Sequence, residues 1–95
     1  MKIWRRDGNR YKSIQVEDVP REIMVTFADR VGAHDIAGPF MIECCENKFD
    51  KSDVMFYLYY YDHDVGHYVN RQDVPVTPEL MDMFRDMVKK EEEEE

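Results

Sequence analysis

The chain of 95 residues lacks several features that would assign it to a broad class of protein. It holds no run of roughly 18 apolar residues, so we expect no transmembrane helix. Its basic start is not followed by an apolar stretch, so we expect no secretory signal. Two cysteines are too few for a disulfide framework, and four glycines and four prolines are too few for a low-complexity chain. We therefore expect one small cytoplasmic domain with no membrane association.

Motifs for nucleotide chemistry or serine hydrolysis are also missing. The glycines stand alone at positions 8, 32, 38 and 66, so the chain has no glycine-rich phosphate loop. Ser13 and Ser52 carry no nucleophile signature. Cys44 and Cys45 are neighbours, which is not the Cys-x-x-Cys spacing, and on a strand they would point to opposite faces. We expect no cofactor, and the sequence favours a binding protein over an enzyme.

The charge is strongly acidic and unevenly placed. The chain has 13 basic and 21 acidic residues, a net charge of −8 and a pI of about 4.8. Residues 91–95 are all glutamate, whereas most charges in residues 1–12 are basic. Binding to DNA or to an anionic membrane requires clustered positive charge, so the acidic balance disfavours both and favours a partner with a basic surface.

The pattern of apolar residues predicts an α+β fold in the order β-β-α-β-β-β-α. Strands are expected at 1–6, 10–16, 40–46, 54–61 and 67–74, with amphipathic helices at 20–31 and from 77 onward. We expect a mainly antiparallel sheet of about five strands, with both helices packed on one face. Residues 1–90 form the single domain, and residues 91–95 are expected to be a disordered acidic tail, because neighbouring glutamates repel at the negative end of a helix.

Two of these elements have competing interpretations. In the first hairpin, a Gly8-Asn9 loop would place Ile3 opposite Ile14, and an Asp7-Gly8 loop would place Trp4 opposite Tyr11. We prefer the first, because it collects the aliphatic side chains on one face. Residues 22–28 also alternate like a strand, although the i, i+4, i+8 spacing within 20–31 favours a helix.

The strand at 54–61 carries the most distinctive surface of the chain. Its residues are apolar or aromatic on both faces, which is typical of a central strand covered on both sides. If both helices cover the side of Phe56 and Leu58, the opposite side is at least partly open. Tyrosine is enriched among the dominant contacts of protein interfaces. The candidate partner-binding residues are on this side and in the acidic turn that follows: Met55, Tyr57, Tyr59, Tyr61, Asp62 and Asp64.

Two alternative sites use other side chains. A tyrosine row can also stack unpaired bases, and the basic hairpin would then supply phosphate contacts from Arg5, Arg6, Arg10 and Lys12. The turn at 62–67 offers imidazoles and carboxylates that suit a divalent metal, from His63, His67, Asp62 and Asp64, with His34 as a further ligand from another loop. A metal there would activate water in a small enzyme.

The leading prediction is a small acidic module that binds a protein partner, as an inhibitor, an immunity-type protein or an accessory subunit. The acidic surface would steer association, and tyrosine and methionine contacts would hold the complex. The single-stranded nucleic-acid binder and the metal-dependent enzyme are the alternatives. A homodimer that closes an uncovered sheet face is compatible with all three.

Overall fold

The computed structural model describes residues 1–33 and 39–93 and confirms the predicted α+β fold. Each strand pairs antiparallel with its neighbour in sequence, so the sheet order is β1-β2-β3-β4-β5. The strands are β1 (Lys2–Asp7), β2 (Tyr11–Glu17), β3 (Phe40–Asn47), β4 (Val54–Asp62) and β5 (His67–Val74). Helix α1 (Arg21–Arg30) is inserted between β2 and β3, and helix α2 (Pro78–Glu93) follows β5.

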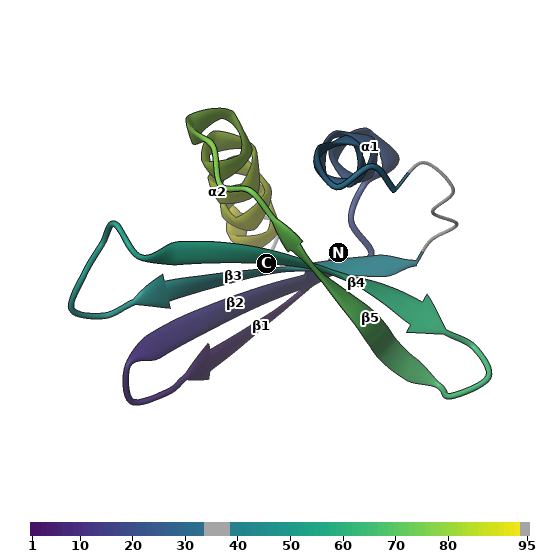
Figure 1. Ribbon diagram of the computed structural model, residues 1–95, viewed down its shortest axis with the longest axis horizontal. Helices are drawn as coiled ribbons and strands as arrows, with labels where there is room; N and C mark the ends of the chain where they lie inside the picture. Colours follow the sequence, from purple (N-terminus) through teal and green to yellow (C-terminus); the bar gives the residue numbers. More distant parts are fainter. Residues whose placement is uncertain (34–38, 94–95) are drawn as a thin grey trace.

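Both helices lie over the same face of a strongly twisted sheet, as Figure 1 shows. Side chains alternate between the two faces of a strand, so β4 directs Phe56 and Leu58 toward the helices. These two residues are 1% and 0% exposed. The core between the sheet and the helices contains Val16, Ile42, Cys44, Phe56, Leu58 and Val74 from the strands and Phe27, Leu80, Phe84 and Met87 from the helices. The other face of the sheet has no described helix over it.

Local sequence signals set the ends of both helices. The Thr77 hydroxyl accepts a hydrogen bond from the Leu80 N–H at 3.2 Å, and Pro78 occupies the first helical position, as predicted for α2. Helix α1 ends in a Schellman motif, in which the Gly32 N–H donates to the Asp29 carbonyl and the Ala33 N–H to the Ala28 carbonyl. Gly32 adopts a φ of +70°, which an L side chain rarely tolerates. The helical interpretation of this segment is therefore confirmed.

The predicted register of the first hairpin is wrong. Ile3 lies opposite Val16 and Arg5 lies opposite Ile14, and the Gly8 N–H donates to the Tyr11 carbonyl at 2.9 Å. The turn therefore lies at residues 9 and 10. Relative to the preferred register, the pairing moves by two residues, and such a shift leaves every side chain on the same face. For this reason, the pattern of aliphatic residues could not distinguish the preferred register from the observed one.

Two further expectations need correction. The apolar strand β4 is an interior strand, paired with β3 and β5, but helices cover only one of its two faces, so it is not covered on both sides as expected. Helix α2 continues to Glu93, so Glu91–Glu93 are helical and not a disordered tail. The Met1 amino group lies 4.0 Å from the Glu91 carboxylate, and Arg5 forms an ion pair with Glu92. These cations offset the repulsion among the glutamates. Glu94 and Glu95 lie outside the described residues.

The structure contains no described helix that could span a membrane. Neither α1 nor α2, the helices in the described parts of the chain, has both the length and the apolar character that a membrane span requires. Both helices instead bury one apolar side each against the sheet.

Candidate functional site

The uncovered side of the sheet carries a cluster of aromatic and charged side chains, which we call the tyrosine face. Odd-numbered residues of β4 point to this side, because Phe56 and Leu58 point to the helices. All four β4 side chains here are half-buried, so they are packed against neighbours and still reach solvent. The tyrosine face consists of Met55, Tyr57, Tyr59 and Tyr61 of β4 with Glu43 of β3 and Arg71 of β5.

Glu43 lies at the centre of the tyrosine face and accepts hydrogen bonds from its neighbours. Its side chain is 8% exposed, and one carboxylate oxygen accepts hydrogen bonds from Ser13 Oγ and Gln15 Nε2, both at 2.7 Å. The other oxygen accepts a hydrogen bond from the Tyr59 hydroxyl at 2.8 Å. Burial by itself raises the pKa of this carboxyl, but the three hydrogen bonds and the nearby Arg71 outweigh burial and hold it below its usual value. Glu43 is therefore an ionised group that joins β2, β3 and β4.

The tyrosine rings beside Glu43 are held in place by specific contacts. The Tyr57 hydroxyl donates to Met55 Sδ at 3.1 Å, and the guanidinium of Arg71 lies 4.6 Å from the centre of the Tyr57 ring. Burial and the hydrogen bond to Glu43 raise the pKa of Tyr59 to about 12. The pKa of Tyr57 is also raised, mainly by burial. Both phenols stay protonated at neutral pH and present a fixed, neutral aromatic surface.

The end of the tyrosine face is formed by the turn between β4 and β5. Tyr61 makes edge-on ring contacts with His63 at 5.0 Å and with Tyr68 at 5.2 Å between ring centres. The Asp62 carboxylate accepts hydrogen bonds from the backbone N–H groups of Asp64 and Val65, so it stabilises the turn. Asp64 is exposed. The structure thus brings Met55, Tyr57, Tyr59 and Tyr61 to one side of the sheet. It does not add Asp62 to them, because the carboxylate of this even-numbered β4 residue is used within the turn, and Asp64 lies in that turn beyond the strand.

The four basic residues of the nucleic-acid alternative do not gather beside the tyrosines. Arg5 and Lys12 share the helix-covered side with Ile14, whereas Arg6 lies opposite Ser13 on the other side. Arg5 pairs with Glu92, and Lys12 Nζ lies 3.3 Å from a Glu46 carboxylate oxygen. Arg10 belongs to the hairpin turn. A continuous basic surface along the tyrosines is not formed by these residues, so the geometry gives this alternative no support.

The metal alternative also lacks the necessary cluster. Within residues 1–33 and 39–93, no three side chains of His, Cys, Asp or Glu come close enough to hold a metal ion. Asp62 accepts hydrogen bonds within its turn, and the His63 ring packs on Tyr61. His67 Nδ1 lies 3.3 Å from the carbonyl of Tyr68. His34 lies outside the described residues.

The sequence prediction missed two members of the tyrosine face. Glu43 had a usable signal, since it is the only charged residue in the strand sequence Phe-Met-Ile-Glu-Cys-Cys of residues 40–45. A charge inside an apolar strand is costly unless hydrogen bonds satisfy it, which predicts partners across the sheet. Arg71 had no such signal, because cations are common in exposed edge strands.

Comparison with known proteins does not identify a relative of this chain: no family model, no curated protein and no solved structure matches it. The function is therefore inferred from the arrangement of side chains on the sheet. The tyrosine face is the part of the described structure where aromatic, sulfur-containing and charged side chains meet on an uncovered surface.

The two thiols differ in exposure and give a simple test of the sheet's orientation. Cys44 is buried under the helices, where burial raises the pKa of its thiol to about 12. Cys45 is half-buried on the uncovered side, and burial together with Glu43 raises its pKa. With a thiol-reactive disulfide at pH 7, we expect Cys44 to react at least about a hundredfold more slowly than in the unfolded chain, and Cys45 to react first. Cys45→Ser should leave only the slow phase, and two equally fast thiols would contradict this orientation.

Proposed function

We propose that this protein is a binding module that uses the tyrosine face to hold a protein partner with a basic surface. The supporting observation is the row of half-buried tyrosines on a sheet side that no described helix covers. Tyrosine provides a large contact area with only two side-chain torsions to fix, so its entropy cost on binding is low. The contacts of Tyr57 and Tyr59 with Arg71, Met55 and Glu43 fix these rings before a partner arrives, which reduces that cost further.

The charges around the tyrosine face support a basic partner. Asp73 lies opposite Tyr57 in the β4–β5 pair and is exposed, and Asp64 is exposed in the adjoining turn. Glu17 and Asp18 come close enough to Tyr68 to raise its pKa, after burial, to about 12. These carboxylates form an acidic border, and a complementary basic border on the partner would accelerate association.

The same charges disfavour a second copy of the chain as the occupant. Each copy has a net charge of −8 and the same acidic border. A symmetric dimer through the tyrosine face would bring like charges together, and such contacts oppose association. A different protein with basic side chains can bind to the same surface without this repulsion.

Affinity capture from native cell extract, read by quantitative mass spectrometry, tests the proposal. The wild-type chain is compared with the double variant Tyr57→Ala/Tyr61→Ala and with Phe49→Ala, which removes an aromatic ring that is 83% exposed in the β3–β4 turn. We expect a stoichiometric protein whose affinity falls at least about tenfold with the double variant and is unchanged with Phe49→Ala. Circular dichroism establishes that each variant is folded.

A charge-reversal variant distinguishes the effect of the carboxylates on the association rate from the effect of the tyrosine contacts on the affinity. Asp64→Lys/Asp73→Lys changes two exposed side chains, so the fold should be retained. We expect association with the captured protein to slow several-fold at low salt, with a smaller effect at high salt. If the double variant Tyr57→Ala/Tyr61→Ala captures the protein as well as the wild-type chain does, the proposal is overturned. Capture that depends on nucleic acid, or a wild-type dimer that Tyr57→Ala/Tyr61→Ala dissociates, would also overturn it.

A further inference from the structure

A basic pocket lies on the helix-covered side of the sheet. It has a volume of about 430 Å³ and is formed by the first half of α2, the β3–β4 turn and three paired strand residues. Lys12, Glu46 and Val54 are register partners across β2, β3 and β4. Paired residues share a face of the sheet, so the pocket opens on the side opposite Tyr57. It is therefore separate from the tyrosine face.

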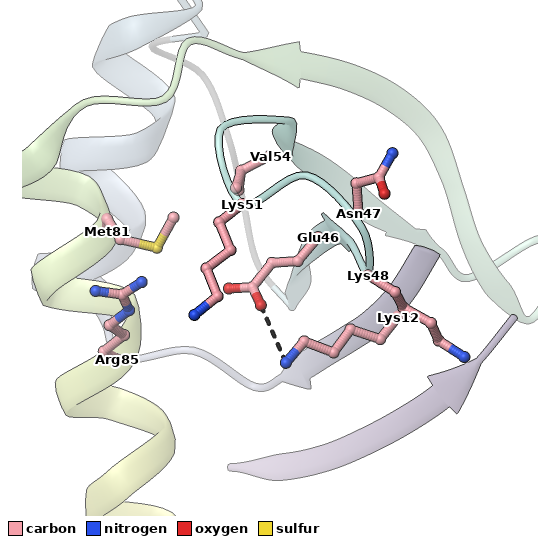
Figure 2. A pocket seen from close by; sticks show the side chains of 8 residues that line it. All are labelled: Lys12, Glu46, Asn47, Lys48, Lys51, Val54, Met81 and Arg85. Atoms are coloured by element: carbon pink, nitrogen blue, oxygen red, sulfur yellow. Dashed lines mark ion pairs between the residues drawn. The ribbon is translucent and has the colours of Figure 1, made fainter. Parts of the chain in front are cut away.

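The pocket concentrates positive charge in an otherwise acidic chain. Four of its lining residues are cationic and only Glu46 is acidic, whereas the whole chain has a net charge of −8. Figure 2 shows Lys12, Lys51 and Arg85 arranged around the Glu46 carboxylate, while Lys48 extends away from α2. Lys48 pairs with Asp7, and Lys12 pairs with Glu46 at 3.3 Å. Neither Lys51 nor Arg85 forms an ion pair with any residue that the structure describes.

An apolar wall stands beside these cations. Met81 and Arg85 are four residues apart on α2, so they face the pocket together. Val54 contributes from the sheet. The pocket volume falls within the range of roughly 300–1,000 Å³ that small-molecule sites occupy. The site thus combines two uncompensated positive charges with a short apolar surface.

We propose that this pocket binds a small phosphate monoester whose organic part is apolar. A phosphate monoester carries a charge of about −1.5 to −2 at pH 7, which matches the two unpaired cations. The planar guanidinium of Arg85 suits bidentate contact with phosphate oxygens, and Lys51 and Lys12 add ammonium donors. Met81 and Val54 contact the organic part. The proposal does not rest on the proposed function, because the two sites lie on opposite sides of the sheet.

Titration of the ¹⁵N-labelled full chain, followed by NMR, tests the site with defined probes. Phenyl phosphate, inorganic phosphate and benzyl alcohol are added at constant ionic strength, which removes general screening effects. We expect phenyl phosphate to shift the backbone amides of residues 46–54 and 78–86, and to bind at least about fivefold more tightly than inorganic phosphate. Benzyl alcohol should cause no saturable shift. Equal affinity for the two phosphates would overturn the assigned ligand class, and shifts spread over the whole surface would overturn the site.

Matched variants localise the binding. Lys51 and Arg85 are exposed, so Lys51→Gln/Arg85→Gln should fold normally and weaken phenyl phosphate binding at least about tenfold. Arg21→Gln removes an exposed cation from α1 outside the pocket and should leave the affinity unchanged. Unaltered binding by the double variant would overturn the proposal. Tyr57→Ala should leave phenyl phosphate binding unchanged, which keeps this test distinct from the test of the tyrosine face.

Discussion

Replacing Phe56 with alanine is expected to lower the free energy of unfolding by about 3–5 kcal/mol. The Phe56 side chain is 1% exposed and lies at the centre of the contact between the sheet and both helices. Its ring centre is 5.4 Å from that of Phe27 on α1, in an edge-on arrangement, and 5.5 Å from that of Phe84 on α2. Removing the ring leaves a cavity where the two helices meet the sheet, because neighbouring side chains relax only partly.

This loss is comparable to the total stability of a small domain, which is about 5–15 kcal/mol. The alanine variant is therefore expected to lose a large part of its stability, and urea denaturation of Phe56→Leu provides a second point with a smaller loss. Phe49→Ala is the matched control, since its ring is 83% exposed, and it should change stability by less than about 0.5 kcal/mol. A loss below about 1.5 kcal/mol in Phe56→Ala would contradict the central role of this ring.

Replacing Glu43 with glutamine is expected to cost about 1–2 kcal/mol at pH 7 and to change how stability depends on pH. The carboxylate accepts three hydrogen bonds, from Ser13, Gln15 and Tyr59, at distances of 2.7, 2.7 and 2.8 Å. Hydrogen bonds to a charged acceptor are stronger than those to an amide oxygen. Glutamine also offers one acceptor oxygen where glutamate offers two, so one of the three donors loses its acceptor.

The pH dependence has a definite sign. The folded state holds the pKa of Glu43 below its usual value of 4.5, so the unfolded chain takes up this proton more readily. The resulting stabilisation is fully present above the unfolded pKa and is lost as the pH falls through 4.5 toward the lower folded pKa. Urea denaturation between pH 3.5 and 7 should show this acid loss in the wild type. In Glu43→Gln this contribution should be absent.

A matched substitution controls for a general effect of removing one negative charge on the pH dependence of stability. Glu93→Gln removes an exposed carboxylate at the end of α2 and should retain the acid dependence of the wild type. Parallel pH profiles for the wild type and Glu43→Gln would show that this carboxylate does not contribute to the acid sensitivity. Tyr59→Phe removes only the hydroxyl donor to Glu43 and should give a smaller change in the same direction.

The secondary structure followed closely from local patterns in the sequence. The Thr77-Pro78 start of α2 and the glycine after α1 act within a few residues, so their effect does not depend on distant contacts. The strand expected at 54–61 was visible as a continuous apolar and aromatic run, and the apolar stripe of α2 as a periodicity of about 3.6 residues. The opposite orientation of Cys44 and Cys45 followed from the same strand alternation.

The features that were predicted wrongly all depend on distant pairs. The hairpin register was ambiguous, because a shift of two residues keeps the same side chains facing the core. Glu91 and Glu92 lie beside the amino terminus and Arg5, and these cations approach the end of α2 only after β1 joins the sheet. The open face of β4 likewise follows from the packing of both helices on the other face and not from the composition of the strand.

For the candidate sites, the sequence by itself determined which residues alternate to which side of each strand, and it identified Tyr57, Tyr59 and Tyr61 as one row. Tertiary structure decided that both helices cover the other side, and it brought Glu43 and Arg71 to that row. It also joined Lys12 to Lys51 and Arg85 in one pocket. The physical reason is the range of the interactions: strand alternation and helix capping act within a few residues, whereas hydrogen bonds and charge clusters between strands and helices require the assembled sheet.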